Sequence, residues 1–275
     1  MIDVHTHPCR LQDTEAYETF QESGEIPERV LAPYFEAIEP VDKAVALAFW
    51  APQIDFRASN DFVAAIVDQV PDRLVGFASV HPVEPGAVTE IERAILELGL
   101  KGVKLGPIYQ DFDPHNRALW PLYRRIEELG VPMMWHQGTS FMVPQGPLEC
   151  ARPFLLDRIA REFPGIKMVI AHFGYPWSRE VVALIRKHPN LYTDLSALKT
   201  RPWFLYNALI DALEYGAEGK VLFGSDYPAY TAAETAEALR QINAFTEGTA
   251  LPRVPEDVIE AIIERDSLAL LGIAD

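Results

Sequence analysis

The sequence predicts an α/β protein of the (β/α)8 class, the TIM barrel, on three observations. Eight short apolar or β-rich stretches recur along the 275 residues, the segments between them have helical periodicity, and proline and glycine mark the helix ends. A doubly wound open sheet would usually show fewer strands and a glycine-rich phosphate-binding turn after the first one, which this sequence lacks. No flexible linker divides the chain, so we expect a single domain over residues 1–275.

The expected strands follow one another at the spacing of βα units, which predicts parallel pairing. They cover residues 2–7, 43–50, 74–81, 102–106, 131–137, 167–172, 190–196 and 221–226. Several intervening helices place proline near the first turn, where its missing N–H costs nothing, and glycine where a left-handed cap is needed. We expect helices over residues 28–39, 60–70, 85–99, 114–130, 153–163, 176–187, 202–216, 232–245 and 255–271.

The amino-acid composition and net charge limit the kinds of molecule that we expect this protein to bind. With 49% hydrophobic and 11% aromatic residues the chain can bury a large core, and its formal charge of −16 repels phosphate backbones and anionic membrane surfaces. We therefore expect a small-molecule substrate, with neither nucleic acid nor a membrane as partner. No apolar run could span a bilayer, no basic segment precedes the first strand, and only two cysteines are present, which predicts a cytoplasmic protein with free thiols.

The C-terminal ends of the strands, where such barrels carry their chemistry, are occupied by ligand-type side chains. His5 and His7 end the first strand, and the period of two places both on one face, with Val4 and Thr6 on the other. The later strands end in His136, His172 and Asp226. Imidazole nitrogens together with a carboxylate suit a divalent ion such as zinc. The sequence therefore predicts a metal site at this end of the barrel.

The stretches around these residues resemble a known family. They are DVHTH at 3–7, GVKL at 102–105, His136, IAHFG at 170–174 and FGSDYP at 223–228. They resemble the amidohydrolase superfamily, and within it the amidohydrolase-related branch that includes aminocarboxymuconate semialdehyde decarboxylase, γ-resorcylate decarboxylase and pyrone dicarboxylate lactonase. The resemblance spans nearly the whole chain and implies a metal-dependent (β/α)8 barrel.

The resemblance also implies roles for individual residues. The ligands of one divalent ion, usually zinc and sometimes manganese, would be His5, His7, His136 and Asp226. His172 would be catalytic, by binding a substrate oxygen or moving a proton, and Asp226 would also take the proton of a metal-activated water. Relatives are often dimers, so the resemblance suggests a homodimer.

Lys104 on the fourth strand leaves two alternatives open. In other branches of the superfamily a lysine from this strand is carboxylated and bridges two metal ions, which would make the site binuclear. Lys104 would otherwise be a cation at the barrel mouth that binds a substrate carboxylate or pairs with a carboxylate of the protein. Several relatives carry a histidine where this chain has Gly106, so their substrates do not transfer to it directly.

Other candidates for the pocket are aromatic residues and arginines near the strand ends. Tyr109 and Trp135 could bind a flat substrate ring, although large aromatic side chains also fill the space between barrel and helices. Arg10 is a candidate for a carboxylate clamp, with Arg57, Arg152 and Arg201 as alternatives. Asp194 is a candidate for orienting a ligand imidazole, or for capping a loop.

Three functions fit these residues. The first is a hydrolase of a small organic acid, ester, lactone or amide, in which metal hydroxide is the nucleophile. The second is a non-oxidative decarboxylase of an aromatic or muconate-type acid, which uses the same mononuclear site. The third is a catalytically inert binding protein, which Asp226 and the lack of cysteine ligands argue against.

Overall fold

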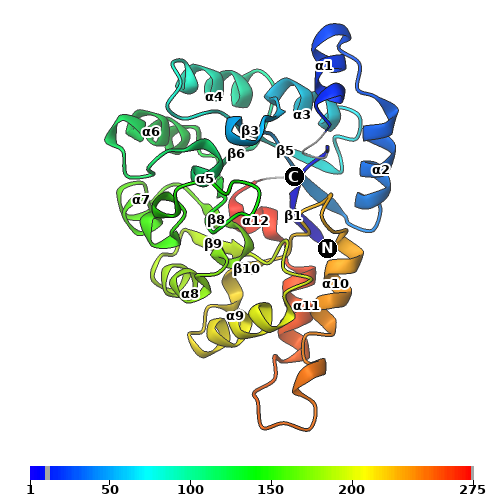
Figure 1. The fold of residues 1–275 in the computed structure, drawn as a ribbon, viewed down its shortest axis with the longest axis vertical. Helices are drawn as coiled ribbons and strands as arrows, with labels where there is room; N and C mark the ends of the chain where they lie inside the picture. Colours follow the sequence, from blue (N-terminus) through cyan, green and yellow to red (C-terminus); the bar gives the residue numbers. More distant parts are fainter. Residues whose placement is uncertain (10–12, 274–275) are drawn as a thin grey trace.

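The computed structural model describes residues 1–9 and 13–273, in which eight parallel strands form a nearly closed barrel surrounded by helices (Figure 1). The strand order is β1-β2-β5-β6-β7-β8-β9-β10. The first and last strands approach each other through backbone hydrogen bonds from Val4 N to Phe223 O, at 3.0 Å, and from Asp226 N to His5 O, at 2.9 Å. The predicted (β/α)8 barrel is confirmed.

The strands lie close to their expected positions. The barrel strands are β1 (Ile2–Thr6), β2 (Lys43–Leu47), β5 (Leu74–Ser79), β6 (Gly102–Leu105), β7 (Met133–Trp135), β8 (Met168–Ile170), β9 (Leu191–Asp194) and β10 (Val221–Leu222). The antiparallel hairpin of β3 (Phe49–Ala51) and β4 (Phe56–Ala58), which we did not expect, follows β2.

The helices surround this barrel, and none of those described is long and apolar enough to cross a membrane. They are α1 (Thr14–Ser23), α2 (Glu28–Ile38), α3 (Asn60–Val67), α4 (Ala87–Leu96), α5 (Pro107–Gln110), α6 (Trp120–Leu129), α7 (Leu156–Glu162), α8 (Ser178–Lys187), α9 (Pro202–Glu214), α10 (Ala232–Arg240), α11 (Glu256–Glu264) and α12 (Ser267–Leu271).

The end of the barrel opposite the expected site is filled by hydrocarbon. Inward-facing side chains such as Val45, Met134 and Leu222 form one buried cluster, and Leu268 and Leu271 of α12 pack into it. The helix predicted over residues 255–271 is two helices in the structure, α11 and α12. Asp266 lies between them and accepts a hydrogen bond from Ala269 N at 3.0 Å, which caps the N-terminus of α12.

Strand β1 departs from simple alternation. Thr6 faces outward as expected and donates to Val45 O at 2.6 Å, but Val4 belongs to the inner cluster. The pairing of β1 with β2 shifts register between Asp3 and Thr6, where β1 has one extra residue. Such a β-bulge changes the direction of side chains, and here it lets both His5 and His7 reach the cavity.

We predict that Gly102→Ala destabilises the barrel. A Cβ atom at residue 102 would lie 2.5 Å from Cζ of Phe77, whose ring fills the barrel interior. Overpacking of this kind costs about 1–3 kcal/mol. Urea denaturation should show this loss in the free energy of unfolding. Gly219→Ala is the matched control, because nothing lies within 4 Å of its added Cβ. Equal stability of the two variants would contradict the packing described here.

Candidate functional site

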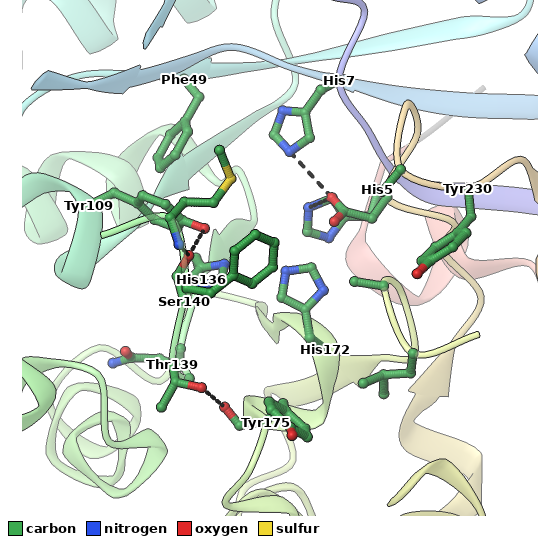
Figure 2. A pocket seen from close by; sticks show the side chains of 18 of the residues that line it. His5, His7, Phe49, Tyr109, His136, Thr139, Ser140, His172, Tyr175 and Tyr230 are labelled. Atoms are coloured by element: carbon green, nitrogen blue, oxygen red, sulfur yellow. Dashed lines mark hydrogen bonds and ion pairs between the residues drawn. The ribbon is translucent and has the colours of Figure 1, made fainter. Parts of the chain in front are cut away.

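The ligand-type side chains meet at the C-terminal ends of the strands, around a cavity of about 720 Å³. Figure 2 shows His5, His7, His136 and His172 around this space, although they come from strand ends far apart in the sequence. The parallel barrel accounts for the convergence, because all eight strands end at the same rim. His172 and Asp226 have positive φ angles of 57° and 66°. The chain thus turns sharply where each of these two side chains enters the site.

The first close group of metal-type donor atoms comes from His5, His7 and Asp226. Their donor atoms lie within 4.8 Å of one another. Oδ1 of Asp226 is 3.3 Å from Nε2 of His5 and 3.6 Å from Nε2 of His7. The structure therefore brings together three of the four residues that the sequence suggested as ligands of one ion.

The fourth expected ligand, His136, lines the same cavity but is not a member of this close group. Its ring centroid is 5.0 Å from that of His172 and 4.7 Å from that of Tyr109. Nε2 of His136 is buried and has no hydrogen-bond partner among the described residues. A buried, unpaired imidazole nitrogen is costly unless something binds it. This orphaned nitrogen and the adjoining nitrogen and oxygen donors fit a divalent ion.

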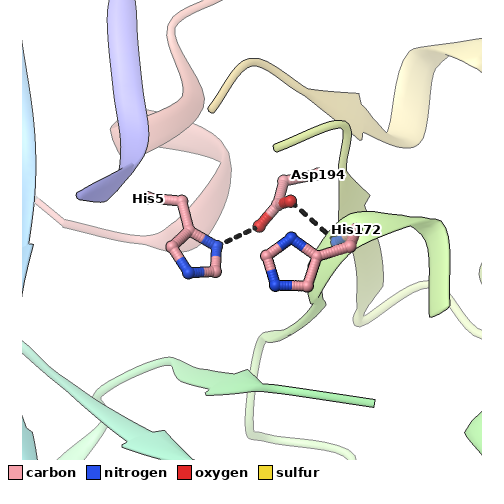
Figure 3. A group of neighbouring side chains, drawn as sticks. All are labelled: His5, His172 and Asp194. Carbon is pink, nitrogen blue, oxygen red and sulfur yellow. Dashed lines mark hydrogen bonds and ion pairs between the residues drawn. The ribbon is translucent and has the colours of Figure 1, made fainter. Parts of the chain in front are cut away.

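A second close group consists of His5, His172 and Asp194 (Figure 3). Its donors already bind one another or Ser196. Nδ1 of His5 donates to Oδ2 of Asp194 at 2.9 Å, and the backbone N of His172 donates to Oδ1 at 2.9 Å. Asp194 therefore has the orienting role that we considered for it. Because Asp194 binds Nδ1 of His5, the other ring nitrogen, Nε2, faces the cavity.

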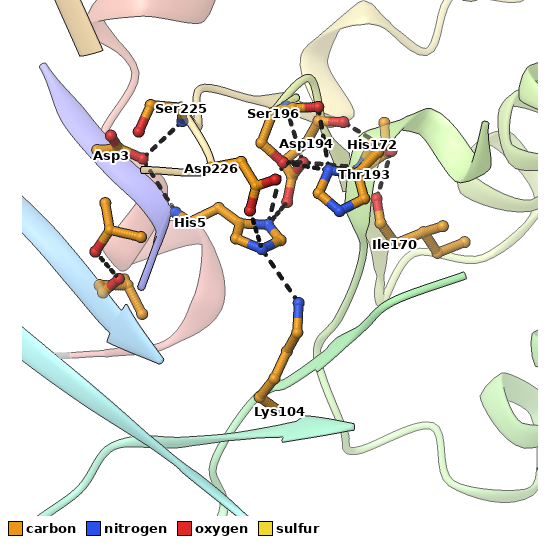
Figure 4. A network of polar contacts seen from close by, with 12 residues as sticks. Asp3, His5, Lys104, Ile170, His172, Thr193, Asp194, Ser196, Ser225 and Asp226 are labelled. Carbon is orange, nitrogen blue, oxygen red and sulfur yellow. Dashed lines mark hydrogen bonds and ion pairs between the residues drawn. The ribbon is translucent and has the colours of Figure 1, made fainter. Parts of the chain in front are cut away.

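Ser196 completes this network (Figure 4). Its hydroxyl donates to the carboxylate of Asp194, so it must accept from Nδ1 of His172, which lies 2.8 Å away. The backbone O of Ser196 is a second acceptor for the same Nδ1, at 3.1 Å. This arrangement places the proton of neutral His172 on Nδ1 and leaves Nε2 toward the cavity that His172 lines. Sequence analysis did not single out Ser196. The available signal was the Asp-x-Ser spacing, since a period of two places both residues on one face.

Burial keeps the imidazoles of His7, His136 and His172 neutral. It lowers the pKa of His7 to about 3 and that of His172 to about 4, against the opposing charge of Asp226. Burial alone would raise the pKa of Asp226, but its electrostatic interactions with His5, His172, His7 and Lys104 outweigh burial and hold that pKa below its usual value. At neutral pH His7, His136 and His172 are therefore neutral and Asp226 is ionised, which are the protonation states in which such groups bind metal.

Lys104 is almost fully buried, at 1% exposure, on the floor of the cavity. Its Nζ lies 3.2 Å from Nε2 of His5, and Figure 4 shows the side chain reaching from β6 toward that ring. Burial lowers the pKa of Lys104 to about 8, while Asp194 and Asp226 oppose the shift. Lys104 thus brings a cationic side chain to the ligand group; its carboxylation remains a prediction.

Two of the remaining expected residues have clear positions. Tyr109 lines the cavity as expected, and its hydroxyl donates to Ser140 at 2.7 Å. The expectation for Trp135 is wrong. Its ring faces outward and packs against Tyr123, with a centroid distance of 5.8 Å, in the core between barrel and helices. Trp135 is fully buried and does not line the cavity.

Among the candidate arginines, Arg201 lines the cavity. Arg57 stacks over Trp50 at 4.9 Å, and Arg152 pairs with Glu180; neither lines this cavity. Arg10 lies outside the described residues.

Sequence analysis also missed Phe49, which forms an aromatic wall with Tyr109. Their ring centroids are 5.5 Å apart in an edge-to-face arrangement. A Cβ atom at Gly106 would lie 2.6 Å from Cζ of Phe49. The glycine that departs from the pattern of several relatives therefore makes room for a ring, and this wall of the cavity is apolar.

This chain is similar to known proteins in sequence and in fold. A γ-resorcylate decarboxylase from Polaromonas sp. is 25% identical over 83% of this chain and 78% of its own length. A 2-keto-4-carboxy-3-hexenedioate hydratase from Sphingobium sp. is 27% identical over 72% of this chain and 64% of its own. The structure of a dihydroxybenzoic acid decarboxylase from Polaromonas sp. JS666, with manganese and 2-nitroresorcinol bound, has a TM-score of 0.65 at 18% identity, covering 99% of this chain and 96% of that one.

The model of the amidohydrolase family matches residues 2–273, a range that contains all eight barrel strands and the donor group of His5, His7 and Asp226. The resemblance noted in the sequence is thereby confirmed, and the converging imidazole and carboxylate donors agree with a divalent-metal enzyme. This chain belongs to the amidohydrolase family.

Proposed function

We propose that this protein is a divalent-metal-dependent, non-oxidative decarboxylase of a small aromatic or muconate-type acid. The observation that carries the proposal is the meeting, in one cavity, of the donor group of His5, His7 and Asp226 with the aromatic wall of Phe49 and Tyr109. Such a cavity suits a flat, unsaturated acid whose carboxylate reaches the donors.

Relatives favour decarboxylation over the hydrolysis that we expected first. The curated relatives described above are a decarboxylase and a hydratase, and the manganese-containing structure is that of a decarboxylase. Both reactions would use the same donors. The relatives therefore support the second of the three functions considered from the sequence.

The proposed ligands are His5, His7, His136 and Asp226. When bound there, a divalent ion such as Mn²⁺ or Zn²⁺ would supply positive charge to hold the substrate carboxylate and a neighbouring oxygen. Lys104, whose Nζ is 3.2 Å from Nε2 of His5, would add a second cationic group at this end of the cavity.

His172 is the proposed proton carrier. Because Nδ1 of the neutral ring donates to Ser196, Nε2 would first take a proton from water and then pass it to the carbon bearing the carboxylate. Cleavage of the bond from that carbon to the carboxylate then releases CO₂ and returns the electron pair to the ring. Solvent replaces the proton, and the reaction needs no oxidant or reductant.

The direct test is to measure CO₂ release by the metal-loaded protein from a panel of hydroxybenzoic and muconic acids, with lactones and esters of similar size alongside. We expect CO₂ from at least one acid, and its loss after chelation and recovery with Mn²⁺ or Zn²⁺. Hydrolysis of the lactones or esters without CO₂ release would contradict the proposal. Binding without any turnover would instead favour the inert binding protein.

We predict that His172→Ala removes activity but leaves metal bound. Loss of the proton carrier should lower kcat on the order of 100-fold or more, while elemental analysis still finds the metal content of the unaltered protein. His136→Ala should lower metal content as well, because its orphaned Nε2 is a proposed ligand atom. The control is His115→Ala, which removes an imidazole that lies outside the cavity and contacts Leu155 O. Loss of metal in His172→Ala would favour the binuclear alternative.

We also predict that Ser196→Ala separates turnover from substrate binding. Without the hydroxyl, Nδ1 of His172 keeps only the backbone O of Ser196 as acceptor and the ring is held less firmly, so kcat should fall about 10-fold while KM and metal content change little. Ser196→Thr, which keeps a hydroxyl, should recover part of the rate. Ser23→Ala, on the exposed end of α1, is the control. An unchanged kcat in Ser196→Ala would remove Ser196 from this role.

A further inference from the structure

The rim of the cavity carries an arginine that the proposed chemistry does not use. Arg201 immediately precedes α9 and lines the cavity with Thr200 and Tyr230. Its Nη1 donates to Ala197 O at 3.0 Å, and its guanidinium lies over the ring of Tyr175 at 4.8 Å. No carboxylate pairs with it among residues 1–9 and 13–273. Its other N–H groups are thus available to a ligand.

This lack of a carboxylate partner is notable in an acidic chain. The protein has 40 acidic against 24 basic residues other than histidine, and nearby Arg152 follows the usual pattern by pairing with Glu180. Carboxylates are therefore plentiful, yet the cavity-lining guanidinium has none. A positive group left unpaired at the rim of a cavity is available to an anionic ligand.

The guanidinium is also held in place before a ligand arrives. Stacking on Tyr175 and the hydrogen bond to Ala197 O restrict a side chain that would otherwise lose much conformational entropy on binding. A planar, restrained guanidinium presents parallel N–H donors that match the two oxygens of a carboxylate.

Cationic groups therefore line the cavity at two positions. Lys104 and the donor group form the floor, Arg201 lies at the rim, and the ring of Phe49 lines the wall. A ligand with one carboxylate could pair with only one of these two positions. A ligand with two carboxylates would place an anion at both.

We propose that Arg201 forms a second anion subsite, which binds a carboxylate other than the one that reacts, and that the substrate is accordingly a dicarboxylic acid. This inference rests on the proposed function for the position of the reacting carboxylate. The Arg201 subsite then selects substrate by its second charge, while the donor group and His172 act on the first carboxylate.

The test compares binding of one-charge and two-charge probes to the metal-loaded protein by titration calorimetry. The probes are benzoate and the three benzenedicarboxylates, phthalate, isophthalate and terephthalate. We expect at least one dicarboxylate to bind about tenfold or more tightly than benzoate, as a charge-assisted hydrogen-bonded pair contributes. Equal affinity of benzoate and all three dicarboxylates would overturn the proposal.

Substitutions assign the preference to Arg201. In Arg201→Gln the advantage of the dicarboxylate should disappear while benzoate affinity stays within about twofold, and Arg201→Lys should keep part of it. Arg179→Gln is the matched control, since that arginine is 86% exposed, pairs with Asp211 and lies outside the cavity. An advantage that survives in Arg201→Gln would overturn the subsite, and so would an equal loss of benzoate binding, which would show a structural role.

The binding readout keeps this proposal separate from the proposed function. A dicarboxylate preference that depends on Arg201, in a protein that releases no CO₂ from any acid, would reject decarboxylation and leave the subsite standing. Release of CO₂ from acids with one carboxylate, at the same kcat/KM as from dicarboxylic acids, would reject the subsite alone.

Discussion

The buried carboxylate of Asp194 is the constraint on which the site depends. It is fully buried, and an ionised group in such a place must be hydrogen-bonded or paired. Its partners are His5 from β1, the backbone of His172 after β8, and Ser196 after its own strand. Satisfying this one charge therefore determines which nitrogen each imidazole presents to the cavity, and it links three strand ends that are remote in sequence.

Backbone strain accompanies this arrangement. His172, Ala197 and Asp226 follow three successive strands of the barrel, and all have positive φ angles, which non-glycine residues seldom adopt. Such conformations persist only where surrounding contacts hold them. Here the hydrogen bonds from Asp226 N to His5 O and from His172 N to the carboxylate of Asp194 supply such contacts at two of the three residues. Hydrogen bonds that join neighbouring strand ends thus position two side chains of the site.

The donor groups and the walls of the cavity come from different parts of the fold. The donor groups lie at the strand ends, whereas Phe49 belongs to the hairpin, Tyr109 to the short helix α5 and Arg201 to the loop before α9. Loops of a barrel can change without disturbing the strands that they follow. This separation is consistent with relatives that include both a decarboxylase and a hydratase. Gly106 illustrates it, because the absence of one side chain admits the ring of Phe49.

The sequence by itself determined the barrel and the strand ends that carry the donors, because apolar periodicity, proline, glycine and an N-terminal His-x-His are local features. Only the tertiary structure decided the direction of Trp135, the bulge that turns Val4 inward, and the presence of Arg201, rather than Arg57 or Arg152, at the cavity. Strands buried on both faces are apolar throughout, so their sequence does not show which side chain points into the barrel. Which groups pair across the site depends on contacts between residues far apart in the chain, and folding alone brings those residues together.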